Sequence, residues 1–162
     1  MIAPPMARRP LTWVRDDDQL ILTGAIDEAT HMSELVGHQR NNRLVLDLAG
    51  VTFINSVGVR EWIRMQTAAA ATGVRIELRR VPDIIVNQLN ITPATRGVSV
   101  VSSFYAPYEC DDCELDELFL VEIAAHGAVL AKKQLPAVTC HSCHRAMEPA
   151  YPPEVYLAFL VG

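Results

Sequence analysis

The sequence predicts an α/β protein in which a mixed β-sheet carries helices mainly on one face and is followed by a small β-rich unit. Three observations support this prediction. Strand-like and helix-like segments alternate along the first 100 or so residues, which is the pattern of βαβ units. A nearly continuous apolar run at residues 44–48 is typical of a strand that is buried on both faces. The rest of the chain is short and acidic and holds all four cysteines.

The size and composition fit one domain and an appendage. The chain has 162 residues, of which 50% are hydrophobic and 20% are charged, as in ordinary globular proteins. No apolar run reaches the roughly 18 residues that a membrane span needs. Residues 1–10 contain Arg8 and Arg9 without the apolar stretch of a secretory signal. We therefore expect residues 1–10 to be a flexible lead-in and the protein to be cytoplasmic.

The chain is expected to open with a hairpin and a helix. Residues 11–14 and 19–26 have strand-like composition, and three consecutive aspartates at 16–18 predict a turn between them. Residues 29–38 then favour a modest helix, with Asp27 as a candidate cap at its start. The apolar run at 44–48 follows as the next strand.

Two further helices and two further strands are predicted after that run. Residues 59–72 repeat apolar side chains at helical spacing, and Gly73 is a typical stop signal. Residues 74–78 alternate apolar and charged side chains with the period of a strand. Pro82 suits the first turn of a helix that runs to about residue 90. The β-branched residues at 98–104 predict the last strand of this domain.

Ser56 lies where the buried strand gives way to a helix. One interpretation is that its hydroxyl only caps the helix, which stabilises a helix by about 1 kcal/mol. The other is that the hydroxyl accepts a phosphate, because a helix N-terminus presents unpaired N–H groups and the positive end of its dipole. Gly58 keeps the first turn uncrowded for an approaching partner.

The segment LDLAGVTFINSVG at residues 46–58 resembles the signature of STAS domains, the fold of sulfate transporters and anti-sigma factor antagonists. The segment ILTGAID at 21–27 also resembles the second strand and acidic loop of that family. The resemblance runs from about Leu11 to Ser103, and the domain is expected to cover residues 11–104. It implies a mixed sheet with helices largely on one side. It also implies partner switching, in which a kinase-like anti-sigma factor binds the domain and phosphorylates it, and phosphorylation breaks the complex.

The resemblance implies a role for five residues. Ser56 occupies the position of the phosphorylated serine, and Asp27 that of an acidic residue in the loop that faces the partner. Asn55, Val57 and Gly58 complete the implied partner-binding surface. The family usually has Asp where this chain has Asn55, and often Ser or Thr where it has Val57.

The four cysteines form two C-x-x-C pairs, and their spacing predicts a zinc ribbon over residues 105–162. Each pair places two thiolates on one turn, and two such turns complete a tetrahedral Zn²⁺ site. Four protein ligands leave no open position, so the zinc would be structural. Segments 118–124 and 128–135 favour a β-hairpin that turns at His126 and Gly127. The predicted ligands are Cys110, Cys113, Cys140 and Cys143.

Other interpretations of this region are weaker. Residues 140–144 also spell C-x-x-C-H, the attachment motif of c-type haem, but haem attachment requires export and would leave the first pair without a role. Neither pair follows a strand in the βα context of thioredoxin-like dithiols. With four cysteines available, His141 and His144 are expected to face solvent. Residues 151–160 are aromatic and apolar, and would either complete the ribbon's sheet or pack against the first domain.

Charge and missing motifs narrow the function. Residues 102–162 hold three Lys+Arg and nine Asp+Glu, a net charge of −6, which disfavours a nucleic-acid partner. The chain has no glycine-rich phosphate loop, nucleophile elbow or H-E-x-x-H helix. We expect a non-enzymatic partner-switching regulator that binds a kinase-like protein. The alternative is a STAS scaffold that binds proteins without being phosphorylated.

Overall fold

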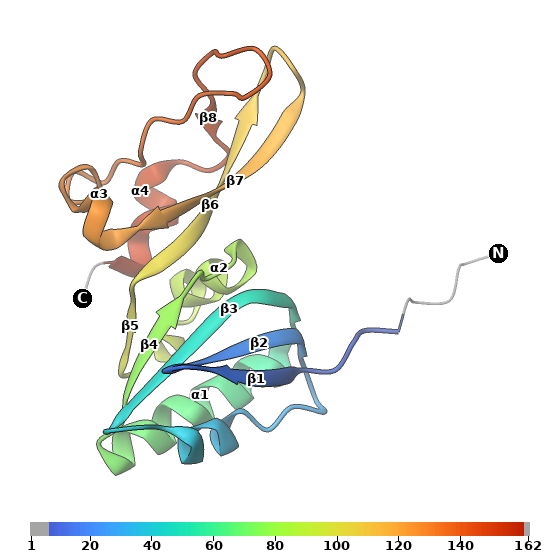
Figure 1. Ribbon diagram of the computed structural model, residues 1–162, viewed down its shortest axis with the longest axis vertical. Coiled ribbons are helices and arrows are strands. Elements are labelled where there is room, and N and C mark those ends of the chain that lie inside the picture. The colour runs from blue at the N-terminus through green and yellow to red at the C-terminus, as the bar shows by residue number, and fades with distance from the viewer. Residues whose placement is uncertain (1–6, 161–162) are drawn as a thin grey trace.

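The computed structural model describes residues 7–160, and its first half is built on a five-stranded sheet in the order β1-β2-β3-β4-β5 (Figure 1). The first two strands are antiparallel and the remaining pairs are parallel, so the sheet is mixed, which confirms the predicted α/β class. The strands are β1 Thr12–Asp16, β2 Gln19–Ile26, β3 Arg43–Ile54, β4 Arg75–Arg79 and β5 Ser99–Val101.

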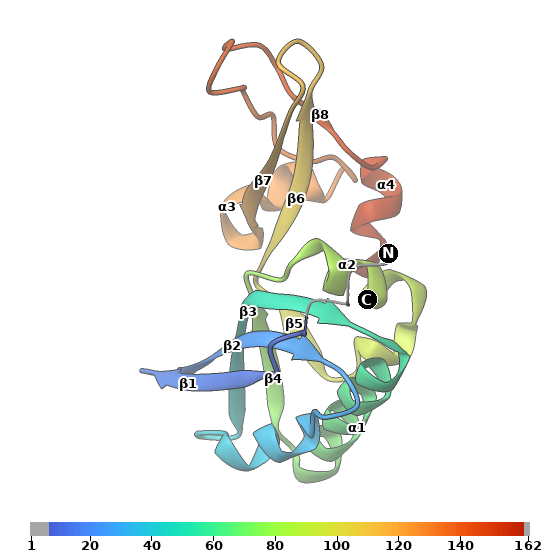
Figure 2. The ribbon, with the colours of Figure 1, turned by 90° about the vertical axis from the view of Figure 1, so that its right-hand side faces the viewer.

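The helices of this half cover one face of the sheet. The chain passes through η1 Met32–His38, α1 Ser56–Thr72 and α2 Asp83–Ile91 between successive parallel strands. Parallel crossovers are right-handed, and these all step in the same direction along the sheet, so each places its helix on the same side. Figure 2 shows α1 and α2 together on that side. Within the described residues, no helix has both the length and the apolar character to cross a membrane.

The formation of helix α1 is explained by its apolar face and by the residues at its ends. Trp62, Met65 and Ala69 recur at helical spacing and are buried against the sheet. The indole N–H of Trp62 donates to the carbonyl of Thr95 at 2.8 Å. The helix ends at Gly73, whose φ of 71° is the left-handed conformation that glycine adopts most readily.

The helix predicted over residues 29–38 is shorter and tighter than expected. Only Met32–His38 is helical, and it is a 3-10 helix without a side-chain cap. The carboxylate of Asp27 accepts the N–H of Ala29 at 3.0 Å, and the N–H of Asp27 donates to the hydroxyl of Thr30 at 3.1 Å. Asp27 therefore closes a local turn, which competes with helix formation, instead of capping the helix.

The helix-free face of the sheet is polar at β4, as the alternation at residues 74–78 predicts. Ile76 and Leu78 are buried against the helices, whereas Glu77 lies on the other face. Glu77 pairs there with Arg43 and Arg79. These pairs are partly exposed, so they contribute little stability and mainly keep this face soluble.

The segment expected to be one strand at residues 98–104 is divided between two sheets. β5 ends at Val101, and β6 Ser103–Cys110 begins a second, antiparallel sheet in the order β7-β6-β8. Its other strands are β7 Leu115–Glu122 and β8 Glu148–Pro149. The N–H of Val81 donates to the carbonyl of Ser103 at 3.1 Å, and the N–H of Tyr105 to the carbonyl of Val81 at 2.8 Å. These bonds fix the second sheet to the end of the first.

The prediction of a hairpin that turns at His126 and Gly127 is wrong. β7 pairs with β6 over its whole length, so the hairpin turns earlier, between Cys110 and Leu115. The residues around the predicted turn form the helix α3 Ile123–Leu130 instead. A short apolar run fits a strand or a helix equally well, and here it forms both, with the change at residue 123.

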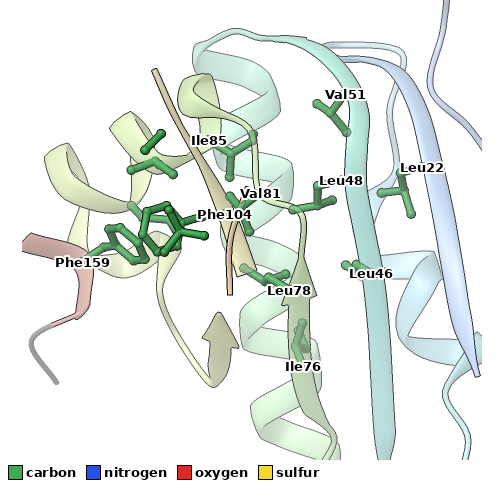
Figure 3. Close-up of a cluster of buried hydrophobic side chains, with 14 of the residues drawn as sticks. Leu22, Leu46, Leu48, Val51, Ile76, Leu78, Val81, Ile85, Phe104 and Phe159 are labelled. Carbon is green, nitrogen blue, oxygen red and sulfur yellow. The ribbon is translucent and has the colours of Figure 1, made fainter. Parts of the chain in front are cut away.

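The C-terminal segment packs against the first half. β8 completes the second sheet, and α4 Pro153–Tyr156 and η3 Leu157–Leu160 then lie against α2 and β6. Phe104 is fully buried and meets Phe159 edge-to-face at a ring-centroid distance of 5.1 Å. Figure 3 shows this pair beside side chains of β4 and α2, in one continuous core. Of the two alternatives for residues 151–160, the packing against the first half is therefore the one realised, because the strand that completes the second sheet ends before residue 151.

Phe104→Ala is expected to lower the free energy of unfolding by about 3–5 kcal/mol, because it opens a cavity where the two halves meet. Chemical denaturation followed by far-UV circular dichroism measures this loss. Val155→Ala is the matched control, since Val155 is 62% exposed in the same region. Its effect should stay within about 0.5 kcal/mol. Equal effects of the two substitutions would contradict the shared core.

Candidate functional site

The four cysteines lie on two turns of the same shape. Cys110 ends β6 and Cys113 lies in the hairpin turn, and Glu114 directly after it has a φ of 51°. In the second turn the N–H of His144 donates to the carbonyl of Cys140 at 2.9 Å, and His144 has a φ of 62°. In both turns a left-handed residue follows the second cysteine, so the chain turns back and leaves both thiols on one side.

The two turns bring their thiols to one point. The Sγ atoms of Cys110 and Cys143 are 3.5 Å apart, those of Cys113 and Cys140 are 4.0 Å apart, and all four lie within 4.8 Å of one another. A tetrahedral Zn²⁺ with Zn–S bonds of about 2.3 Å requires S···S separations of about 3.8 Å. A disulfide would require about 2.05 Å, and all four cysteines are free. The four residues predicted from sequence can therefore hold a metal ion.

The thiols differ in their acidity. The backbone N–H groups of Cys143 and Ser142 lower the pKa of Cys140 to about 7. The neighbouring sulfur of Cys143, together with burial, raises the pKa of Cys113 to about 12. A bound metal ion would let all four thiols lose their protons, because it takes the place of the protons and offsets the negative charges of the thiolates.

The side chains around the cysteine cluster connect the two turns. Arg145 in the second turn pairs with Asp112 in the first, at 2.8 Å. His141 is exposed and pairs with Glu117 of β7, and the thiols already supply four ligands. His141 and the exposed His144 therefore lie at the surface beside the cluster, as expected.

Ser56 is the first residue of α1, and it is exposed. The cap of this helix is Asn55, whose side-chain oxygen accepts the N–H of Gly58 at 2.9 Å. The interpretation of Ser56 as the helix cap is therefore wrong. Within residues 7–160 the exposed Ser56 hydroxyl has no hydrogen-bond partner. Val57 beside it is partly buried.

The loop after β2 lies beside this helix end. The N–H of Asn55 donates to the carbonyl of Ile26 at 3.3 Å, which places the Asp27 turn next to the start of α1. The side-chain N–H₂ of Asn55 donates to the Glu28 carboxylate at 2.9 Å. The structure therefore brings Asp27, Asn55 and Ser56 to one surface, as the sequence predicts.

Two residues at this surface were not predicted. A hydrogen bond from its own backbone N–H and another from Asn55 lower the pKa of Glu28, whose carboxylate lies beside Asn55 at the start of α1. The guanidinium of Arg8 lies over the ring of Phe53, 3.6 Å from its centroid. Arg9 bonds to β2, since its carbonyl accepts the N–H of Ala25 at 3.0 Å. Arg8 belongs to the predicted lead-in at 1–10, of which residues 1–6 lie outside the described residues.

Gly58 allows α1 to approach β2. A Cβ at this position would lie 2.0 Å from the carbonyl oxygen of Ile26, which is far inside van der Waals contact. Only glycine leaves room for the helix to start here. The expected role of Gly58 at the partner surface thus has a structural component, because this glycine sets the position of Ser56 relative to the Asp27 loop.

Comparisons with known proteins give no family for this chain: no protein-family model matches it, and no curated protein matches it significantly.

Proposed function

We propose that this protein is a non-enzymatic regulator of the anti-sigma factor antagonist type, and that a kinase-like partner binds the surface around Ser56 and phosphorylates it. The observation that carries the proposal is the state of Ser56. Its hydroxyl is exposed and unbonded within residues 7–160 at the start of a 17-residue helix, while Asn55 supplies the cap. Ser56 thus has no structural task that would explain a serine here.

The surroundings of Ser56 suit a switch driven by charge. A phosphate on Ser56 would be stabilised by the positive end of the α1 dipole and by hydrogen bonds from the first N–H groups of the helix. The same phosphate would repel the Glu28 carboxylate, which Asn55 holds beside the helix start. Phosphorylation is therefore expected to displace the loop of Asp27 and Glu28, which changes the surface that the partner contacts.

Substitution of Ser56 tests the proposal. Ser56→Asp is expected to weaken binding to the kinase-like partner at least about tenfold, because it places a charge next to Glu28, while Ser56→Ala keeps binding and loses phosphorylation. Calorimetric titration with the purified kinase-like anti-sigma factors of the same host measures both variants. Thr52→Asp, at an exposed site of β3, controls for the added charge. If both Ser56 variants bind as the wild type does, the protein is a phosphorylation-independent scaffold instead.

We further propose that the second half is a zinc ribbon, with a structural Zn²⁺ held by Cys110, Cys113, Cys140 and Cys143. The two S···S distances of 3.5 and 4.0 Å, with all four sulfurs within 4.8 Å of one another, support a tetrahedral zinc site, and four protein ligands leave no position for a substrate. Thiols that bind a metal must stay reduced, which fits a cytoplasmic location. The net charge of −6 over residues 102–162 favours a protein partner over a nucleic acid.

A further inference from the structure

The second sheet has an edge strand, β7, that no other segment of residues 7–160 covers. In the order β7-β6-β8, β7 is bonded to β6 on one side only. It is eight residues long and follows the full length of β6. A strand edge of this length is a template for another strand unless it is blocked by bulges, proline or a covering segment. The register with β6 has no bulge, and β7 contains no proline.

The backbone groups that point outward from β7 follow from the bonds of β6. The carbonyl of Pro107 accepts the N–H of Ala150 at 2.9 Å, and the N–H of Tyr105 donates to the carbonyl of Val81. The odd-numbered residues of β6 therefore point away from β7, and their partners on β7 point away from β6. These partners are Asp116, Leu118, Leu120 and Glu122. Within residues 7–160, the N–H groups of the first three have no hydrogen-bond partner.

The side chains of these residues lie on the outer face of the sheet. Their neighbours across β6 are Glu109, Pro107 and Tyr105, whereas the inner face carries the buried residues of the core. Leu118 is 59% exposed, and Leu120 beside it is partly exposed. Leu118 and Leu120 thus form a small apolar strip along the free edge.

Acidic side chains frame this strip. Asp116 and Glu122 lie at its two ends, and Glu109 and Glu148 lie on the neighbouring strands. Arg145, a basic residue of the same half, is already paired with Asp112 at the cysteine turns. A segment that adds to this edge would therefore meet apolar surface in its centre and negative charge on both sides.

We infer that the outer edge of β7 binds an extended peptide segment of a partner protein, in which the residues on the outer face of the sheet are apolar at the centre of the segment and basic at its two ends. The open N–H and C=O groups of Asp116, Leu118 and Leu120 would extend the sheet by one strand, as in β-augmentation. Apolar side chains of the segment would pack beside the leucines, and its lysines or arginines would lie beside the acidic residues.

A second copy of the chain fits this edge poorly. An antiparallel pair of β7 strands centred on Phe119 would place Asp116 of each copy opposite Glu122 of the other. Like charges directly opposite on neighbouring strands are destabilising. The charge pattern therefore favours a basic segment over self-association, and this surface is distinct from the one proposed around Ser56.

The test uses the whole chain with its zinc and a fluorescein-labelled seven-residue peptide, Lys-Thr-Val-Thr-Val-Thr-Lys, whose lysines and valines share one face of an extended strand. Amide hydrogen exchange followed by NMR is the direct measurement. The amides of Leu118 and Leu120 should exchange fast in the free protein and become protected when the peptide binds, whereas that of Phe119, bonded to β6, should be protected throughout. Affinity from fluorescence anisotropy should fall about tenfold between roughly 0.05 and 0.3 M salt.

Matched controls make the outcome specific. A peptide with glutamate in place of lysine should not bind. Leu118→Pro should abolish binding, because it removes only an outward N–H, whereas Leu118→Ala keeps that N–H and should bind within about threefold of the wild type. Should Leu118→Pro fail to fold, the exchange data on the wild type decide alone. Unchanged exchange at Leu118 and Leu120 on saturation with peptide would overturn the inference, as would their protection in a dimer of the free protein.

Discussion

Removal of the metal from the four-cysteine cluster is expected to unfold the distal end of the second sheet while the first sheet persists. The segment between α3 and β8 has little regular structure: besides the pairs of Arg145 and His141, it has the bridge between Thr139 and Ala146 with its backbone bonds, and a hydrogen bond from the Tyr108 hydroxyl to the carbonyl of Pro136 at 2.6 Å. In zinc-finger peptides, structural zinc contributes about 10–16 kcal/mol of apparent folding free energy. Without that contribution, the segment cannot stay folded.

Cys140→Ser tests this expectation together with a strong chelator. Elemental analysis should give one zinc per chain for the wild type, and less than a tenth of that for the variant, by the ligand requirement of such sites. Amide signals of residues 131–147 should collapse to unfolded positions, and those of β2 and β3 should remain. His141→Ala is the control, because His141 is an exposed neighbour and not a ligand, and it should retain full zinc. A metal-free wild type with the same spectrum would contradict the zinc ribbon.

Gly58→Ala is expected to destabilise the protein by more than about 4 kcal/mol, which is exceptional for the addition of one methyl group. The added Cβ would lie 2.0 Å from the backbone oxygen of Ile26, so the start of α1 must move away from β2. The movement would break the hydrogen bond from the N–H of Asn55 to the same oxygen. Thermal and urea unfolding measure the loss.

Gly37→Ala is the matched control for this substitution. Gly37 lies in η1, its φ is not positive, and a Cβ there meets nothing within 4 Å. Its effect should be close to zero, since only the change in helical propensity remains. A Gly58→Ala variant as stable as Gly37→Ala would show that α1 does not approach β2 as closely as described.

Much of the fold was predictable because its periodicities are clear. The period-two alternation at residues 74–78 and the helical spacing at 59–72 each predict one element, and both elements are present. The errors come where two principles compete. Ser56 is a good capping residue by type, but Asn55 lies one position earlier and captures the N–H of Gly58. At residues 118–130 the apolar composition gave no way to distinguish a strand from a helix.

The two candidate sites differ in how many of their residues could be predicted from the sequence. The cysteine cluster is set by local spacing, because each C-x-x-C folds its own turn, so all four cysteines were predictable and lie together. Glu28 and Arg8 reach the Ser56 surface through the packing of distant segments. The position of Glu28 after Asp27 was the only sequence signal for it, and nothing in the sequence marked Arg8.

The most direct measurement of the central claim is the mass of the protein purified from its own host, under native and denaturing conditions, with the modified residue located by fragmentation. We predict one zinc that is lost on denaturation, and a phosphate on Ser56 in a fraction of the molecules that changes with growth condition. A protein that carries no phosphate on Ser56 in any growth condition would contradict the proposed switch, and a covalent haem on Cys140 and Cys143 would contradict the zinc ribbon.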